Sequence, residues 1–183
     1  RSAAARLYER LARSLPDEYL VIHDARWVGR SDQDIPAPDG HAEFAIAHPE
    51  RGILLIDVLE GGLSWDPHAA RWHHRAPAHE AAIADPFVGL EARLDALGRH
   101  MAAHPSSLPS QPTSGFALAL PDVLVPRGGL ASHAPADRIL DMAALDDVKG
   151  AIEAAYDHWA GRRPATGSAS ARWWWRVFED IFI

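Results

Sequence analysis

Two carboxylates, Glu43 and Asp57, are the side chains of this sequence best suited to chemistry. Each stands in an otherwise apolar run, AEFAIA at 42–47 and ILLIDV at 53–58, which predicts a buried strand. The turn sequence HPERG at 48–52 joins the two runs, so the strands are expected to be neighbours. Because a buried carboxylate needs a proton, a partner or a metal, the two acids could share Mg²⁺ or Mn²⁺ and position a water against a phosphodiester.

A purely structural role for either acid stays open. A carboxylate at the end of a strand is commonly solvated or hydrogen-bonded to the N-terminus of a helix, because buried charges must be paired. The presence of two acids on strands joined by a single turn is what favours the metal hypothesis over this simpler one.

The chain around these acids alternates between helical and extended patterns. Apolar residues recur at helical spacing over 3–14, after the start signal Asp85-Pro86, and after Asp146 or Asp147. Further strands are predicted at 19–23, 63–66, 71–74 and 116–120. This alternation predicts an α/β domain with a mixed central sheet of about five strands flanked by helices.

Length and composition fit one globular domain. The 183 residues are assigned to a domain at 1–160, followed at 161–183 by a linker and a Trp-rich tail that could lead into further chain. There is no cysteine, which excludes disulfides and thiolate metal sites and fits a cytoplasmic protein. No apolar run reaches the roughly 18 residues of a membrane-spanning helix. The chain opens at Arg1 and not at Met, as expected for a piece of a longer protein.

The formal net charge of −7 bears on nucleic-acid binding. Tight, non-specific binding needs clustered Lys and Arg side chains on the phosphates, so the domain as a whole is not expected to hold DNA strongly. A local arginine patch, such as Arg26 with Arg30, remains compatible with weak contact.

Two other clusters carry weaker hypotheses. The first cluster consists of the histidines His68, His73, His74 and His79. A cluster of histidines suggests a zinc site, but this spacing fits no closed zinc pattern, and we interpret these histidines as polar hairpin residues. The tryptophans Trp173 to Trp175 would form an exposed apolar patch, so the tail is expected to dock on the domain or on a partner. Stacking on single-stranded bases is the alternative use of these rings.

The segment that holds the two acids resembles the NERD (nuclease-related) domain, which is itself similar to the PD-(D/E)XK nucleases. The resemblance begins with Glu43-Phe44 and the phrase His48-Pro49-Glu50-Arg51-Gly52, and it continues with Asp57-Val58 and Trp65-Asp66. It covers roughly residues 3–160, with further matches in LPDEY at 15–19, HDARW at 23–27, DPF at 85–87, LPDV at 120–123 and HW at 158–159.

The resemblance implies a PD-(D/E)XK-like core and a metal-dependent nuclease site. Glu43 and Asp57 would be the catalytic residues and the ligands of Mg²⁺ or Mn²⁺, with Glu9 as a helper from the first helix. An exposed helix acid near Arg6, Arg10 or Arg13 is the other interpretation of Glu9. The implied partners are DNA and a superfamily 1 helicase domain, in cis or in trans.

Departures from the family pattern point away from a competent enzyme. The family's lysine falls at Leu59, its glutamine at Gly89 and its next glycine at Glu60, while its aspartate before Phe is the longer Glu43. The only lysine of the chain, Lys149, lies far along in the last predicted helix. Leucine can neither orient a water nor stabilise developing charge, and a placed cation is typically worth about 10²–10³ in rate.

We therefore expect a catalytically degenerate, nuclease-related DNA-processing domain that positions DNA or acts as a docking module. The alternative is an active Mg-dependent phosphodiesterase that uses Glu43 and Asp57. A plain scaffold without a nucleic-acid role is the third hypothesis.

Overall fold

The computed structural model describes residues 2–28, 39–103, 112–126, 130, 134, 136–162 and 181–182, and its centre is a five-stranded sheet. The sheet has the order β1-β2-β3-β7-β8. Its strands are β1 (Leu20–Trp27), β2 (Gly40–His48), β3 (Gly52–Val58), β7 (Ser114–Leu120) and β8 (Ile139–Asp141). Neighbours among β1, β2 and β3 are antiparallel, whereas β7 and β8 run parallel to β3. The predicted mixed α/β sheet is confirmed at this level.

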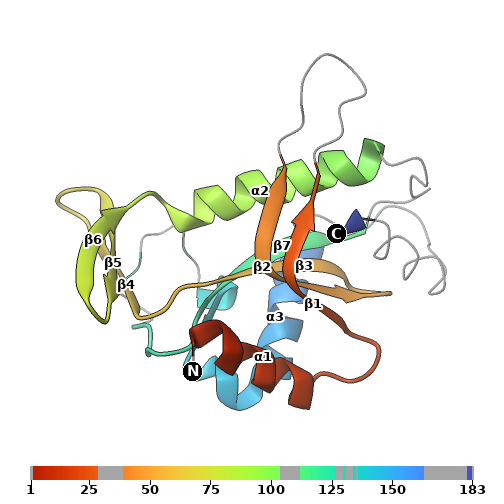
Figure 1. Ribbon diagram of the computed structural model, residues 1–183, viewed down its shortest axis with the longest axis horizontal. Coiled ribbons are helices and arrows are strands. Elements are labelled where there is room, and N and C mark those ends of the chain that lie inside the picture. The colour runs from red at the N-terminus through yellow and green to blue at the C-terminus, as the bar shows by residue number, and fades with distance from the viewer. Residues whose placement is uncertain are drawn as a thin grey trace.

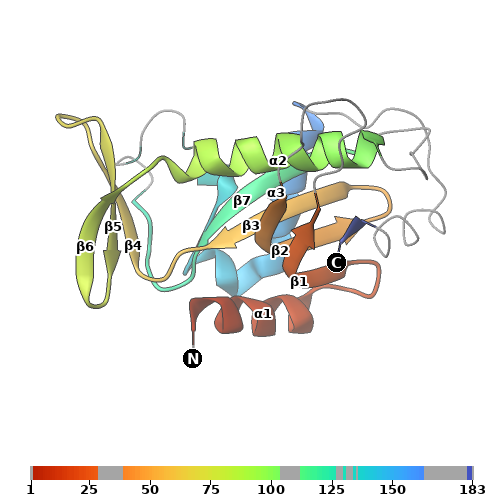
Figure 2. The same ribbon diagram turned by 45° about the horizontal axis from the view of Figure 1, so that its top comes forward.

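Three helices cover the sheet from both sides (Figures 1 and 2). They are α1 (Ala3–Ser14), α2 (Pro86–Ala103) and α3 (Val148–Ala160), with short 3₁₀ turns η1 (Ala136–Arg138) and η2 (Ala144–Asp147) before α3. Helix α2 lies along one face, while α1 and α3 lie together on the other. The start signals were predicted correctly, because Asp85 accepts a bond from the Phe87 amide at 2.8 Å and Asp147 accepts one from the Gly150 amide at 3.0 Å.

A second, three-stranded antiparallel sheet projects from the body between β3 and α2 (Figure 1). Its strands are β4 (Gly62–Asp66), β5 (Arg71–Ala76) and β6 (His79–Ile83). Trp65 of β4 packs on Trp72 of β5, with ring centroids 5.2 Å apart. Strand β6 was not predicted, because the sequence HEAAI is mostly exposed and lacks the apolar alternation that signals a strand.

The core lies on both faces of β3 and β7. Every residue of β7 is buried, as are the first five of β3, since these strands have a neighbour on each side and a helix on each face. Gly115 on β7 receives the Trp159 ring of α3 so closely that a Cβ atom would lie 2.2 Å from it. The expectation that apolar runs occupy the middle of a covered sheet is confirmed.

Two hydrogen bonds fasten α3 to this core. The Tyr156 hydroxyl donates to the carbonyl oxygen of Ile46 at 2.8 Å, and Trp159 Nε1 donates to that of Phe116 at 2.9 Å. Burial raises the pKa of Tyr156 well above its ordinary value of 10.0, because the ionised form would lose its hydration.

At the C-terminal end, the structure describes Ile181 and Phe182 of the tail. Ile181 is buried, and Phe182 packs edge-on against Trp27 with centroids 6.1 Å apart. Trp173 to Trp175 lie outside the described residues. None of the described helices has the length and apolar content that crossing a membrane requires.

The raised Tyr156 pKa predicts a specific loss of stability in alkali. Its contribution is fully present below the ordinary pKa of 10.0 and is lost as pH rises toward the folded-state value, because only the unfolded chain ionises there. Tyr156→Phe should flatten the fall in unfolding free energy between about pH 9 and pH 12, while losing about 1 kcal/mol at pH 7 with the hydrogen bond. Urea unfolding at a series of pH values measures both.

Tyr8→Phe is the matched control for this prediction, because the Tyr8 side chain is half exposed. Burial also raises the pKa of Tyr19, so some alkaline slope should persist in the Tyr156 variant. An unchanged slope in Tyr156→Phe would show that Tyr156 does not carry this pH dependence.

Candidate functional site

The register of β2 and β3 brings the two predicted acids together. The ladder ends with Phe44 opposite Ile56, so Glu43 and Asp57 face each other one step beyond it. The Glu43 amide lies 3.4 Å from Asp57 Oδ1, to which it donates. Both side chains are partly exposed, 32% for Glu43 and 23% for Asp57. The pair lies where the β2–β3 ladder ends, a place that we call the rim of β2 and β3, while each strand stays paired with its other neighbour.

An arginine of α2 holds the Asp57 carboxylate. Arg93 Nη2 lies 2.5 Å from Asp57 Oδ2, while Nη1 donates to the carbonyl oxygen of His41 at 3.1 Å and Nε to that of Gly89 at 3.4 Å. The guanidinium is therefore directed at three protein acceptors from three different elements. Such a planar, permanently charged fork holds its partners more rigidly than a lysine would.

Arg93 is a site residue that was not predicted from the sequence, although one signal was present. Arg93 follows Leu90 by three positions and precedes Leu97 by four, so it lies in the apolar stripe of α2 that faces the sheet. A charged side chain in such a stripe needs a partner on the sheet. Asp57 is that partner, 36 residues away in the chain.

The second acid, Glu43, also has a protein partner. His23 Nε2 on β1 lies 3.1 Å from Glu43 Oε1. The His23 ring packs on Phe44 at 5.1 Å and beside Tyr8 of α1 at 6.4 Å, which fixes its place at the edge of the sheet.

A third set of charges continues the site along β1 and β2. Arg26 binds both carboxylate oxygens of Asp24, through Nε at 3.1 Å and Nη2 at 3.2 Å, and His41 Nε2 lies 2.8 Å from Asp24 Oδ1. The hydrogen bond from Arg26 is the largest cause that lowers the Asp24 pKa below its ordinary 3.8. Asp24 has a left-handed φ of 54°, which aspartate tolerates better than most residues.

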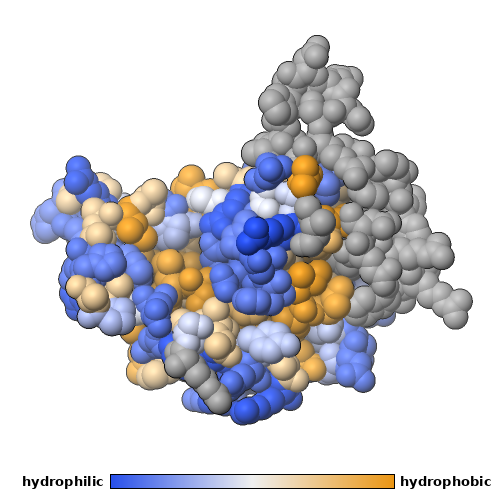
Figure 3. Space-filling model, in the orientation of Figure 1, coloured by the Kyte–Doolittle hydropathy of each residue, from blue (hydrophilic) through white to orange (hydrophobic). Residues whose placement is uncertain are grey.

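We call these connected side chains the β1–β2 polar patch. Figure 3 shows a hydrophilic region over β1 and β2, with apolar surface on either side of it. The members of the patch are His23, Asp24, Arg26, His41, Glu43, Asp57 and Arg93. Arg30, which the sequence offered as a companion of Arg26, lies outside the described residues.

Glu9 is placed in a different setting from the acid pair. Its Oε2 lies 3.8 Å from Arg13 Nη2 on the same helix, which is the arrangement of the alternative interpretation. Glu9 lines a hollow between α1 and the segments that follow β7 and β8, with Arg6, Arg10, Arg13, Pro121, Met142, Leu145 and Asp146. Helix α1 covers the face of the sheet opposite α2, from which Arg93 reaches Asp57. The helper role of Glu9 stays a prediction.

Leu59, at the position where the resemblance implies a lysine, has an apolar side chain that cannot take the role of that lysine. Leu59 is partly buried and its side chain packs against the core, while its amide donates to the carbonyl oxygen of Ala119 at 2.9 Å. Among the residues that the structure describes, no group of three or more His, Asp or Glu side chains is placed to hold a metal ion. The positive charge that the structure places beside Asp57 is the guanidinium of Arg93.

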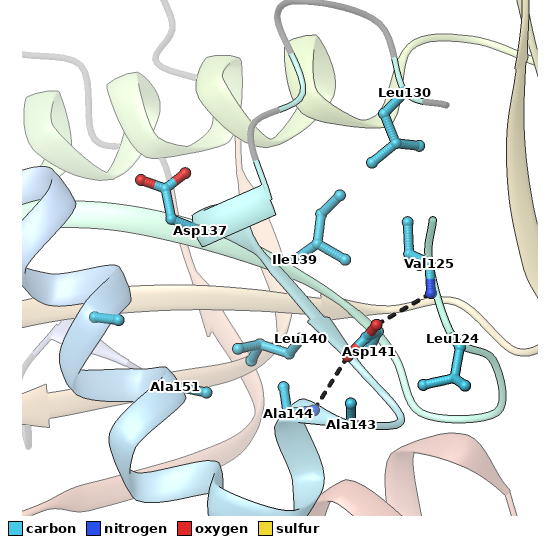
Figure 4. A pocket seen from close by; sticks show the side chains of 11 residues that line it. Leu124, Val125, Leu130, Asp137, Ile139, Leu140, Asp141, Ala143, Ala144 and Ala151 are labelled. Atoms are coloured by element: carbon cyan, nitrogen blue, oxygen red, sulfur yellow. Dashed lines mark hydrogen bonds between the residues drawn. The ribbon is translucent and has the colours of Figure 1, made fainter. Parts of the chain in front are cut away.

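A separate cavity of about 440 Å³ lies beside β8 and α3 (Figure 4). Its wall is mostly apolar, and the Asp141 carboxylate at its edge accepts bonds from the Val125 amide at 3.0 Å and the Ala144 amide at 3.1 Å. Asp137 points away from Asp141 and pairs with His158. Both acids thus have partners, and we place no chemistry in this cavity.

Comparisons with protein-family models, with curated proteins and with solved structures return no match. The resemblance to the NERD domain therefore remains a prediction from the sequence.

The lowered Asp24 pKa tests the geometry of the patch. Arg26→Gln should raise the Asp24 pKa toward 3.8, because the carboxylate loses its main hydrogen-bond donor. A carboxyl-detected NMR titration reads this pKa directly. Since a lowered carboxyl pKa stabilises the fold above the unfolded-state value, the stability contributed by Asp24 is present at neutral pH and is lost as pH falls through the folded pKa.

Arg71→Gln on the small sheet provides the control, since Arg71 is exposed and lies outside the patch. An Asp24 pKa that does not move in Arg26→Gln would contradict the pairing described above.

Proposed function

We propose that this chain is a nuclease-related domain of the NERD type, with a PD-(D/E)XK-like core, which has lost catalysis and positions DNA or acts as a docking module. Two features support its origin. The order of helix, mixed sheet, helix, strand and helix is the one that the resemblance implies. The two acids of the motif also lie side by side at the rim of β2 and β3.

The contact between Arg93 and Asp57 is the observation that carries the loss of catalysis. Both motif acids are already bound by protein groups, Asp57 by Arg93 and Glu43 by His23. The lysine position holds Leu59, whose side chain packs on the core. A nuclease of this type needs its carboxylates to bind a metal and its lysine to orient the water or stabilise the developing charge. Here the carboxylates are bound by protein side chains, and the lysine is replaced by leucine.

A DNA-positioning role is supported by the outer part of the patch. Arg26 and His41 have side chains that are 63% and 48% exposed, and both contact Asp24 within the same patch. With a net charge of −7 on the chain, phosphate contact there would be local, weak and strongly dependent on salt. A helicase domain, in cis or in trans, is the partner that the resemblance suggests, and a cytoplasmic location fits the absence of cysteine.

Binding of labelled DNA at low salt tests this role. We expect weak binding that is detected by fluorescence anisotropy with single-stranded, double-stranded or forked DNA. Arg26→Gln should weaken it several-fold and lower the salt slope by about 1, because one phosphate contact is lost. Arg71→Gln is the matched control and should bind as the unchanged protein does. Absence of binding to every DNA at low salt would favour the plain scaffold.

Cleavage decides between this proposal and the active nuclease. We expect no cleavage of any of these DNAs with Mg²⁺ or Mn²⁺ at high protein concentration. Cleavage that Asp57→Asn abolishes would establish instead the Mg-dependent phosphodiesterase with Glu43 and Asp57 at its centre.

A further inference from the structure

The acid pair as it lies does not fit a divalent cation. Asp57 Oδ2 is bound by Arg93 at 2.5 Å, Asp57 Oδ1 faces the Glu43 amide at 3.4 Å, and Glu43 Oε1 faces His23 at 3.1 Å. Such ions take about six oxygen ligands with water included. An ion on Asp57 Oδ2 would have to displace the guanidinium, because two positive groups cannot occupy the same place on one carboxylate oxygen.

We propose that Arg93 stands in for a divalent cation at Glu43 and Asp57, so that the domain is complete without a metal, and that removing its charge opens a Mn²⁺ or Mg²⁺ site there. The inference rests on the proposed function in one respect, that the two carboxylates descend from a metal site. Its test involves no DNA.

The structure gives three reasons why Arg93 can fill this role permanently. An arginine guanidinium keeps its positive charge in proteins. It is held from three sides, by the Asp57 carboxylate and by the carbonyl oxygens of His41 and Gly89. Its backbone lies in the 18-residue helix α2, which packs on β2, β3 and β7 and so fixes the guanidinium relative to both acids.

Charge accounting supports the same conclusion. Asp57 and Glu43 carry two negative charges at the rim of the sheet, and Arg93 returns one positive charge to them. With Arg93 neutral, two neighbouring carboxylates would remain without their guanidinium partner, which is an environment that favours a bound cation. The removed guanidinium would also leave the space beside Asp57 Oδ2 open to an ion and its waters.

Mn²⁺ titration of matched variants tests the proposal. Calorimetry and thermal unfolding should show no saturable binding and no rise in Tm for the unchanged protein or for Arg99→Gln, an exposed arginine on the same helix. Arg93→Gln should have a lower Tm without metal and should bind Mn²⁺ with a Kd of about 10⁻⁴–10⁻³ M, the range of weak carboxylate sites. Added Mn²⁺ should then raise its Tm, because a ligand that binds only the folded state stabilises it.

Two further variants separate charge from packing. Arg93→Lys keeps the positive charge with a shorter side chain and should gain no Mn²⁺ site. Arg93→Gln combined with Asp57→Asn should lose the gained site. Binding of Mn²⁺ to Arg93→Lys as tight as to Arg93→Gln would overturn the proposal, and so would a folded Arg93→Gln that binds no Mn²⁺.

The unchanged protein supplies a test that does not depend on the folding of any variant. Paramagnetic Mn²⁺ should leave the NMR signals of the Glu43 and Val58 amides unbroadened at concentrations up to about 10⁻³ M. Selective broadening at these amides would show that the metal enters with Arg93 present and would overturn the proposal. Such a result would leave the DNA-binding test unaffected, and a failure to bind DNA would leave this one unaffected.

Discussion

The pairing of β3 with β2 on one side and β7 on the other is the constraint on which the rest of this structure depends. Because β3 is bonded along both edges, its side chains can point only at the two faces, and the first five are buried there. Helices α2 and α3 are required to cover those faces. The polar side chain of β3 is therefore found at the end of this strand, where the ladder with β2 stops and Asp57 lies opposite Glu43.

The two carboxylates at this rim are contacted by side chains of the protein itself. Half-buried carboxylates placed side by side repel each other and must be neutralised. Arg93 does this for Asp57 from α2, while His23 of the edge strand β1 contacts Glu43 at 3.1 Å. Gly89 belongs to the same arrangement, because its carbonyl oxygen accepts from Arg93, and a Cβ atom there would meet nothing within 4 Å. Steric crowding at that Cβ position is thus not why glycine stands there.

Local patterns were enough to predict the elements that bury one continuous stripe or run. A few neighbouring residues predict each of these elements. Examples are the helical spacing before Leu11, the helix start at Asp85-Pro86 and the apolar runs of β2 and β3. Strands β6 and β8 were not predicted. Strand β6 is mostly exposed and lacks apolar alternation, whereas β8 is only three residues long and is defined by its parallel pairing with β7. The adjacency of Glu43 and Asp57 follows from the hairpin and could be predicted from the sequence. The contact of Arg93 with Asp57 depends on how α2 crosses the sheet, which is a feature of the tertiary structure that local patterns do not encode.

A protein cation and a metal ion can each neutralise negative charge on a carboxylate, but they differ in the binding positions that they leave available. A bound ion keeps exchangeable positions that a phosphate oxygen or a water can take, and catalysis by metals of this kind depends on them. The Arg93 guanidinium, held by three protein acceptors, offers no such exchangeable position. Under the proposed function, DNA contact must therefore fall on the exposed neighbours Arg26 and His41, and the acid pair acts as a brace between α2 and the sheet that sets where those neighbours stand.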